Sequence, residues 1–318
     1  AMHYHARTIY TNTPAAGAMR AYGAPQIIFA VEGIIEEAAR KIGMDPVEFR
    51  IKNAARQGDA DPLSGERFES CGLIECLQRG KALIRWDEKR AARPKRQTGA
   101  MRRGLGVACF SYASGTYPVC LEIAGARIIL NQDASLHIQV GATEIGQGLD
   151  TIVAQMAAET IGGPFDDVHV VSTQDTDVAP FDTGAYASRQ AYVASNAVFR
   201  AARELKAKIL EHAGRVSGIL SGELDILNGE IVQRKDPSRK VVSLKEVALN
   251  AYYDKERGGQ LTADVSHKTC TNAPTFGCTF VEIAVDVPLC KVDIKEIYNV
   301  HDSGVILHPV MALSLIHI

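Results

Sequence analysis

The sequence predicts an α+β fold, in which helices and strands are mixed without a regular βαβ rhythm. Several long segments place apolar residues with helical spacing, and several short segments are rich in branched residues or alternate as strands do. The two kinds of segment do not take turns along the chain, which argues against a doubly wound sheet. The hydrophobic content of 46% and the charged content of 23% are typical of a globular protein.

The first ninety residues favour helices. Pro25 suits the first position of a helix and Gly43 suits the residue after its end, with an apolar stripe between them. Asp45 is a good N-cap for a second helix, because its carboxylate can accept from the free N–H groups of the first turn, and Pro46 suits the next position. The helices expected in this part span residues 25–41, 45–55 and 73–90.

A strongly basic segment follows at residues 91–103. A nucleic-acid patch is one interpretation, but no aromatic residues are interleaved and the whole chain has a net charge of −2. We therefore expect a solvated linker. It would separate a first domain at residues 1–90 from a second at residues 104–312.

The second part of the chain mixes both kinds of element. Asn228-Gly229 is the typical turn of a two-residue β-hairpin, here within residues 224–234. A long Ala-rich helix begins near Ser188, which is a credible N-cap. The other expected strands are residues 104–112, 121–130, 134–140, 167–173, 276–287 and 290–299, and the expected helices are residues 149–161, 188–212 and 243–251.

Composition excludes several classes of protein. The near-neutral charge gives no electrostatic case for nucleic acid, and no run of about 18 apolar residues is present to span a membrane. The seven cysteines are odd in number and contain no C-x-x-C pair, which disfavours a disulfide framework, a zinc site and an iron–sulfur site within the chain. Reduced, buried thiols in a cytoplasmic protein are expected.

Residues 141–148, Gly-Ala-Thr-Glu-Ile-Gly-Gln-Gly, lie between a strand-like run and a helix-like run. A Gly-rich turn of this kind exposes backbone N–H groups at the positive end of a helix dipole, where anions such as phosphate bind. Taken alone, a plain turn is as good an interpretation as a ligand site.

Two more small-residue loops also precede helices. Residues 173–190 contain Asp175, Asp177 and Asp182, for which Asx turns are a better interpretation than a metal site. Residues 18–26 contain Arg20 and Tyr22, which would point the same way if this segment were extended. Three such loops could converge on one polyanionic cofactor.

Together these motifs resemble the xanthine dehydrogenase family, in the part that binds the molybdenum cofactor. The resemblance covers roughly residues 6–312 and implies the mixed sheets and helices of the molybdenum-cofactor-binding domains of the xanthine oxidase family. The motifs that carry it are M-R-A-Y-G-A-P-Q at 19–26, G-A-T-E-I-G-Q-G at 141–148, D-T-D-V-A-P-F-D-T-G-A-Y-A-S-R-Q at 175–190 and H-D-S-G at 301–304.

The resemblance implies roles for particular residues. Arg20 and Ala187 match the family's molybdenum-site positions, and Tyr22 and Tyr117 match aromatic positions that contact the substrate. Glu144 is interpreted as a supporting residue, and His301-Asp302 as structural. The residues expected to hold the molybdopterin and its phosphate are Gly146, Gln147, Gly148, Ser188 and Arg189.

The family's catalytic Glu, in a G-E-P-P-like motif, has no counterpart here, so the base is expected beyond Ile318. The chain is therefore expected to be an incomplete fragment of a molybdenum-binding subunit and to be inactive alone. Residues 313–318 do not continue the family pattern and are expected to be a non-native tail.

The parent enzyme would hydroxylate hypoxanthine or xanthine with oxygen from water. It would pass electrons through 2Fe–2S clusters and FAD, carried by partner subunits of a hetero-oligomer, to NAD+. Two alternatives stay open. In the first, the parent is a molybdo-hydroxylase of an aldehyde or another N-heterocycle. In the second, the chain is a non-catalytic assembly module.

Overall fold

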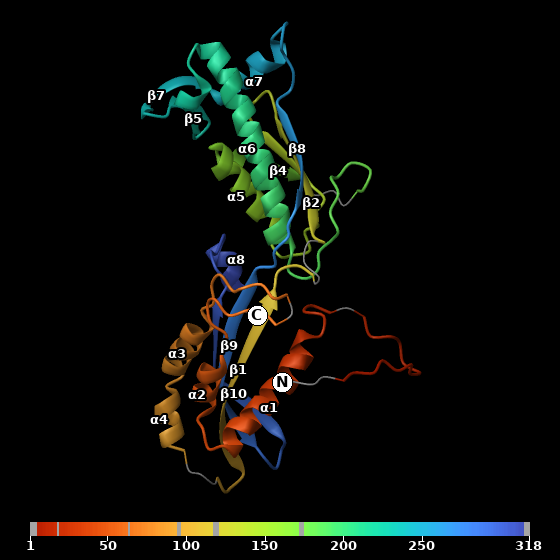
Figure 1. Cartoon of the computed structure of the whole chain (residues 1–318), viewed down its shortest axis with the longest axis vertical. Coiled ribbons are helices and arrows are strands. Elements are labelled where there is room, and N and C mark those ends of the chain that lie inside the picture. Colours follow the sequence, from red (N-terminus) through yellow and green to blue (C-terminus); the bar gives the residue numbers. More distant parts are fainter. Residues whose placement is uncertain are drawn as a thin grey trace.

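The computed structural model describes residues 5–17, 19–62, 64–93, 97–116, 121–171 and 175–314. The molecule is elongated, with two lobes stacked along its long axis (Figure 1). Each lobe combines a sheet with helices, and the α+β prediction is confirmed. None of the helices in these ranges combines the length and the apolar character that a membrane crossing requires.

The lower lobe in Figure 1 is built on a three-stranded antiparallel sheet with the strand order β1-β9-β10. Helix α3 packs against β9 and β10. The elements of this lobe are α1 (Ala24–Lys41), α2 (Pro46–Asn53), α3 (Leu73–Leu83), α4 (Trp86–Ala91), β1 (Met101–Ala113), β9 (Pro274–Asp286), β10 (Lys291–Asp302) and α8 (Pro309–Ser314).

The upper lobe holds a four-stranded sheet of order β4-β3-β2-β8, in which only the β3–β4 pair is parallel. A small antiparallel sheet, β5-β6-β7, lies beside it. The elements are β2 (Ile123–Leu130), β3 (Leu136–Val140), α5 (Leu149–Ile161), β4 (Val168–Val171), α6 (Gln190–Ser217), β5 (Leu224–Leu227), β6 (Glu230–Gln233), β7 (Asp236–Ser243), α7 (Leu244–Tyr253) and β8 (Thr262–Lys268), with single 3-10 turns at Phe165–Asp167 and Ser221–Glu223.

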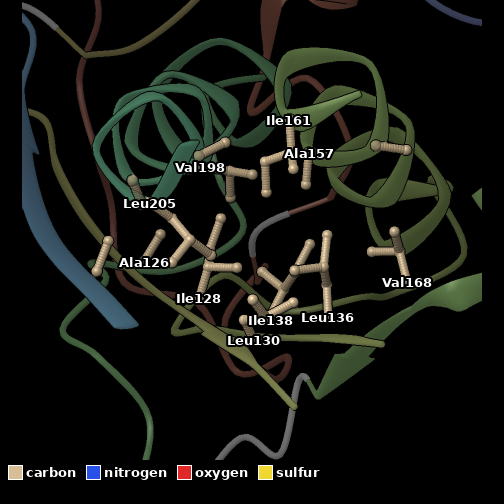
Figure 2. Packing of buried hydrophobic residues seen from close by; sticks show 14 of the residues in the cluster. Ala126, Ile128, Leu130, Leu136, Ile138, Ala157, Ile161, Val168, Val198 and Leu205 are labelled. Atoms are coloured by element: carbon tan, nitrogen blue, oxygen red, sulfur yellow. The ribbon is translucent and has the colours of Figure 1, made fainter. Parts of the chain in front are cut away.

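The core of the upper lobe lies between the four-stranded sheet and helices α5 and α6. Alternation along β3 turns Leu136 and Ile138 toward the helices, where they meet Ile161 of α5 (Figure 2). Ile128 of β2 and Leu205 of α6 close the same cluster (Figure 2). This packing fixes α5 and α6 side by side, so the loops that lead into them are fixed as well.

The lower lobe has a separate core. Leu77 of α3 and Trp86 of α4 pack with Phe276 and Phe280 of β9, and the rings of Trp86 and Phe280 meet edge to face with centroids 5.6 Å apart. Helices from the first ninety residues therefore share a core with strands that begin after residue 100. The basic segment at 91–103, expected as a domain boundary, does not separate two cores.

Three local predictions need correction. The single helix expected at residues 73–90 is two helices, because Arg85 adopts a left-handed backbone with φ of 57°. Ser188 is not an N-cap, since its own φ is 51° and helix α6 begins at Gln190 without a side-chain cap. Strands β7 and β8 were not expected, while the hairpin turn at Asn228 is confirmed.

Candidate functional site

Two of the three predicted loops meet at the end of the upper lobe that faces the lower lobe. A Cβ at Gly141 would lie 2.0 Å from the carbonyl oxygen of Pro180, so this approach requires glycine. The side-chain amides of Gln147 and Gln190 lie 2.6 Å apart. Loop 141–148, which leads into α5, and loop 175–189, which leads into α6, therefore form one surface.

Loop 141–148 already holds an anion, the carboxylate of Glu144. Its Oε1 accepts from the backbone N–H groups of Gly146 at 2.6 Å and Gly148 at 3.1 Å, and its Oε2 accepts from Asp150 at 3.2 Å. The left-handed backbone of Gly146 and Gly148, with φ of 99° and 81°, turns these donors toward one point. Glu144 thus occupies the position that the sequence suggested for phosphate.

The pKa of Glu144 reflects this arrangement. Partial burial alone would raise the pKa, but the N–H groups of Gly148, Asp150 and Gly146 bond the ionised form and hold the pKa below its ordinary value. The carboxylate is therefore charged at neutral pH and acts as an internal cap of the α5 helix dipole.

Gln147 is also engaged within its own loop. Its Oε1 accepts from the N–H of Ile145 at 2.7 Å, and its Nε2 donates to the carbonyl of Thr143 at 2.9 Å. These bonds fold loop 141–148 into a closed turn. The Gly146, Gln147 and Gly148 motif is therefore held by hydrogen bonds of its own loop.

Loop 175–189 has a different character at its end. Ala187 and Ser188 adopt left-handed backbone angles, with φ of 47° and 51°, which are uncommon for residues with a Cβ. Within the described ranges, the N–H groups of these two residues have no hydrogen-bond acceptor. Successive free N–H groups in such a conformation form an anion-binding concavity, here directly before the 28-residue helix α6.

Arg189 lies next to these donors, but its guanidinium faces the interior. Its Nη1 donates to Asp182 at 2.6 Å and to the carbonyl of Gly184 at 3.0 Å, and its Nη2 donates to the carbonyl of Ile123 at 2.6 Å. The side chain is fully buried, and Nε donates to Glu122. The geometry therefore gives Arg189 a supporting position rather than an open ligand contact.

The first predicted loop differs from its expected shape. Residues 20–23 form a turn, closed by the Tyr22 N–H donating to the carbonyl of Met19 at 2.8 Å, with left-handed φ at Ala21 and Tyr22. The extended segment that would align Arg20 with Tyr22 is not present. Both side chains are exposed, at the N-terminal end of α1. Tyr117 lies outside the described residues.

The acidic residues of loop 175–189 form turns. Asp175 accepts from the N–H of Asp177 at 2.9 Å, and Asp182 accepts from the N–H of Gly184 at 2.8 Å. In the part of the chain that the structure describes, no group of three or more His, Cys, Asp or Glu side chains is placed to hold a metal ion. The Asx-turn prediction is confirmed for both residues.

The His301-Asp302 motif ties two parts of the lower lobe together. Asp302 Oδ2 accepts from the N–H of Gly72 at 2.8 Å, at the start of α3. The His301 ring packs against Phe110 with centroids 5.1 Å apart, and burial lowers the pKa of the imidazole. These contacts are structural, as the sequence suggested.

Sequence reasoning missed one acid that shapes the site, Glu122. Glu144 was expected as a supporting residue, and its bonds to the backbone of its own loop agree with that role. Glu122 carries no local signal, because its partner Arg189 is 67 residues further along the chain. A cavity of about 730 Å³, lined by His137, His169 and Tyr252 among others, opens at the α7 end of the lobe, far from the two loops.

Comparisons with known proteins found family models and relatives that match most of this chain. Two family models, both described as molybdopterin cofactor-binding domain, match residues 1–54 and 79–317. The putative xanthine dehydrogenase molybdenum-binding subunit XdhA of Escherichia coli is 55% identical over 99% of this chain and 42% of that protein. The aldehyde oxidoreductase molybdenum-binding subunit PaoC of the same species is 31% identical, over 98% of this chain and 40% of that protein.

Solved structures share the fold. A reconstituted CO dehydrogenase from Oligotropha carboxidovorans matches with a TM-score of 0.82 and 23% identity, over 93% of this chain and 39% of that one. Quinoline 2-oxidoreductase from Pseudomonas putida 86 matches with a TM-score of 0.77 and 21% identity, over 90% of this chain and 38% of that one. The chain spans 42% and 40% of the length of the two curated relatives named above.

Proposed function

Because the chain belongs to the molybdopterin cofactor-binding domain family, we propose that its two helix-leading loops hold the phosphate-bearing pterin of a molybdenum cofactor. The complete protein would be the molybdenum-binding subunit of a xanthine dehydrogenase. The 55% identity to a relative of that name supports this choice.

The free donors of Ala187 and Ser188 carry the proposal. Their N–H groups lack an acceptor in the described ranges, their backbone is left-handed, and the α6 dipole favours a negative charge beside them. Ser188 is exposed and can add its hydroxyl as a further donor. These residues fit a phosphate group, whereas the donors at the start of α5 are taken by Glu144.

Gly146, Gln147 and Gly148 then form the wall beside that phosphate. Their loop is closed by its own hydrogen bonds and joins Gln190 through Gln147, so it offers a rigid surface to the pterin rather than a mobile one. The N–H of Gln147 has no acceptor among the residues that the structure describes, so this wall can still supply it as a donor. Rigid placement matters, because the protein's contribution in a cofactor enzyme is positioning and electrostatics.

The remaining assignments follow the family motif. The bound cofactor would supply the molybdenum centre at which a carbon beside a ring nitrogen is hydroxylated. We assign Arg20 and Ala187 to the surroundings of the metal, where the small Ala187 side chain leaves room for close approach. Tyr22 and Tyr117 are assigned to contacts with the substrate ring, and the catalytic base is assigned to a Glu outside this chain.

Hypoxanthine or xanthine is the proposed substrate. An aldehyde or another N-heterocycle is the alternative, supported by the 31% identity to an aldehyde oxidoreductase subunit. We also propose that partner subunits carry FAD and 2Fe–2S clusters and deliver electrons to NAD+. The relatives' description as subunits supports a hetero-oligomer, and we place it in the cytoplasm.

A charge placed at Ser188 tests the phosphate site. Ser188→Asp puts a carboxylate where the phosphate would bind, and aspartate tolerates left-handed backbone better than most residues, so the loop should keep its shape. The matched control is Thr183→Asp, which adds the same charge to an exposed position of the same loop. The full-length protein is purified from a host that makes the cofactor, and molybdenum and pterin are measured per polypeptide.

We expect Ser188→Asp to lower both contents by at least about tenfold, which corresponds to roughly 1.4 kcal/mol of binding free energy. Thr183→Asp should retain the content of the unaltered protein, and both variants should melt within a few degrees of it. Stoichiometric pterin in Ser188→Asp would overturn the assignment, and equal losses in both variants would reduce it to a non-specific charge effect.

A further inference from the structure

A buried network of three charged side chains ties together segments that are far apart in the sequence. Arg189, Glu122 and Asp182 have no exposed side-chain surface. Arg189 pairs with Glu122 through Nε and with Asp182 through Nη1 at 2.6 Å. The guanidinium therefore links the start of β2 with the loop that leads into α6.

Glu122 extends the network to a third segment. Its Oε1 accepts from both the N–H of Thr116, at 2.8 Å, and the hydroxyl of Thr116, at 2.7 Å. One residue earlier, the N–H of Gly115 donates to the carbonyl of Ala187 at 2.8 Å. Residues 115–116 and 182–188 are thus joined twice, once through backbone and once through Arg189.

The backbone at Ala187 and Ser188 needs such support. Left-handed conformations are unfavourable for residues with a Cβ and persist only when the surrounding structure holds them. The carbonyl of Ala187 and the side chain of Arg189 are anchored on either side of Ser188. Contacts on both sides of Ser188 therefore hold the N–H groups of Ala187 and Ser188 in their orientation.

The charges in the network do not cancel. Two carboxylates face one guanidinium, and Asp182 Oδ2 is buried without a hydrogen-bond partner in the described ranges. Burial would raise the pKa of Glu122, but the bonds from Thr116 and Arg189 outweigh it and hold the pKa below its ordinary value. Removing Arg189 would leave two unpaired buried carboxylates, a costly state.

We propose that Arg189 is a positioning residue that couples residues 115–116 to residues 182–188 and so preforms the donors of Ala187 and Ser188. The coupling itself stands on this structure alone. Only the identity of the ligand, a pterin phosphate, rests on the proposed function.

The test compares variants that leave different net charges in the buried network. Arg189→Gln leaves two negative charges in the network, Glu122→Gln leaves one pair that cancels, and the double variant leaves a single negative charge. Glu122→Gln is nearly isosteric, so it keeps a foldable variant in the set. The matched control is Arg127→Gln, which removes an arginine from the exposed ion pair with Asp264, whose side chains are 45% and 56% exposed.

Hydrogen–deuterium exchange of the full-length protein, prepared without cofactor, reads the coupling in peptides covering residues 105–116 and 182–193. We expect Arg189→Gln to speed exchange in both peptides by about tenfold or more, as coupled neighbours typically show. Glu122→Gln should affect both peptides less, and adding Glu122→Gln to Arg189→Gln should restore part of the protection. Arg127→Gln should change neither peptide.

The proposal is overturned if exchange at 105–116 stays unchanged in both Arg189→Gln and Glu122→Gln, or if the double variant shows no recovery. A merely structural loss would also speed exchange in β5–β7 peptides, which we expect to stay protected. Pterin content is then measured in the cofactor-loaded variants. If the unaltered protein holds no pterin, the proposed function fails while the exchange result still decides the coupling.

Discussion

Glu144 shows how one side chain can take the place of a ligand. A Gly-rich turn before a helix usually indicates an anion site, and the donors of Gly146 and Gly148 do converge as that pattern predicts. The anion they bind is a carboxylate from the same turn. The free donors lie one helix away, at Ala187 and Ser188.

Glu144→Gln should weaken the fold in a pH-dependent way. The folded-state pKa of Glu144 is depressed, so its contribution is present above the unfolded-state pKa of about 4.3 and is lost as pH falls through the folded-state value. At pH 7 we expect a loss of about 1 kcal/mol in unfolding free energy, typical of a lost helix cap. Urea unfolding between pH 7 and pH 3 measures it.

The control for this variant is Glu159→Gln, an exposed position on α5, the helix that follows the loop of Glu144. It should be neutral at both ends of the pH range. A Glu144→Gln deficit that stays constant down to pH 3 would show that lost packing, rather than the charged cap, causes the destabilisation.

At this scale the sequence named residues more readily than it predicted their conformation. Ala187 and Ser188 were identified through the family motif, but neither residue type indicates the left-handed backbone that both adopt. Arg189 was expected, from the resemblance to the family motif, to help hold the phosphate. Its actual partner, Glu122, is distant in sequence, and long-range pairing of this kind leaves no local pattern.

At the scale of elements, the site depends on two helices that start at the same end of a sheet. Helices α5 and α6 pack side by side on the four-stranded sheet, so their leading loops meet. Gly141 sets the distance between these loops, because a Cβ there would overlap Pro180 and crowd Asp182.

Gly141→Ala should therefore push the two loops apart. We expect a destabilisation of about 1–3 kcal/mol, typical of overpacking, and faster proteolytic cleavage within residues 175–189. Gly163→Ala is the matched control, since a Cβ at Gly163 meets no atom within 4 Å. Thermal melting and limited proteolysis make the comparison. Equal melting temperatures and equal cleavage rates in the two variants would mean that the loops accommodate the added methyl group without loss of stability.

Elements with strong local signals were predicted well. Asp45 caps α2 through the N–H groups of Val47 and Glu48, and the Asn228 turn closes its hairpin as expected. The break at Arg85 and strand β7 were missed. A left-handed arginine has no propensity signature, and the charged, proline-containing β7 is a strand because β6 pairs with it.

At the scale of the whole molecule, the lower core combines segments from both ends of the chain, and the upper core is formed by the segment between them. The sequence did not predict this arrangement. Helices α1–α4 and α8 build the lower lobe with β1, β9 and β10, while the elements from β2 to β8 build the upper lobe. The basic segment at 91–103 suggested a boundary by composition. The chain passes from the lower to the upper lobe between β1 and β2, and returns between β8 and β9.

The candidate site lies at that junction. Loops from the upper lobe face the lower lobe there, and the network of Arg189 reaches residues 115–116 in the connection between them. A large cofactor that spans both lobes would explain why the donors of Ala187 and Ser188 open at this point rather than toward the α7 end.

A structure of the full-length protein loaded with its cofactor tests the central claim most directly. We predict that the pterin phosphate lies within hydrogen-bonding distance of the N–H groups of Ala187 and Ser188, while Glu144 keeps its bonds to Gly146 and Gly148. A phosphate bound at the start of α5 with Glu144 displaced, or one that contacts neither Ala187 nor Ser188, would contradict the account.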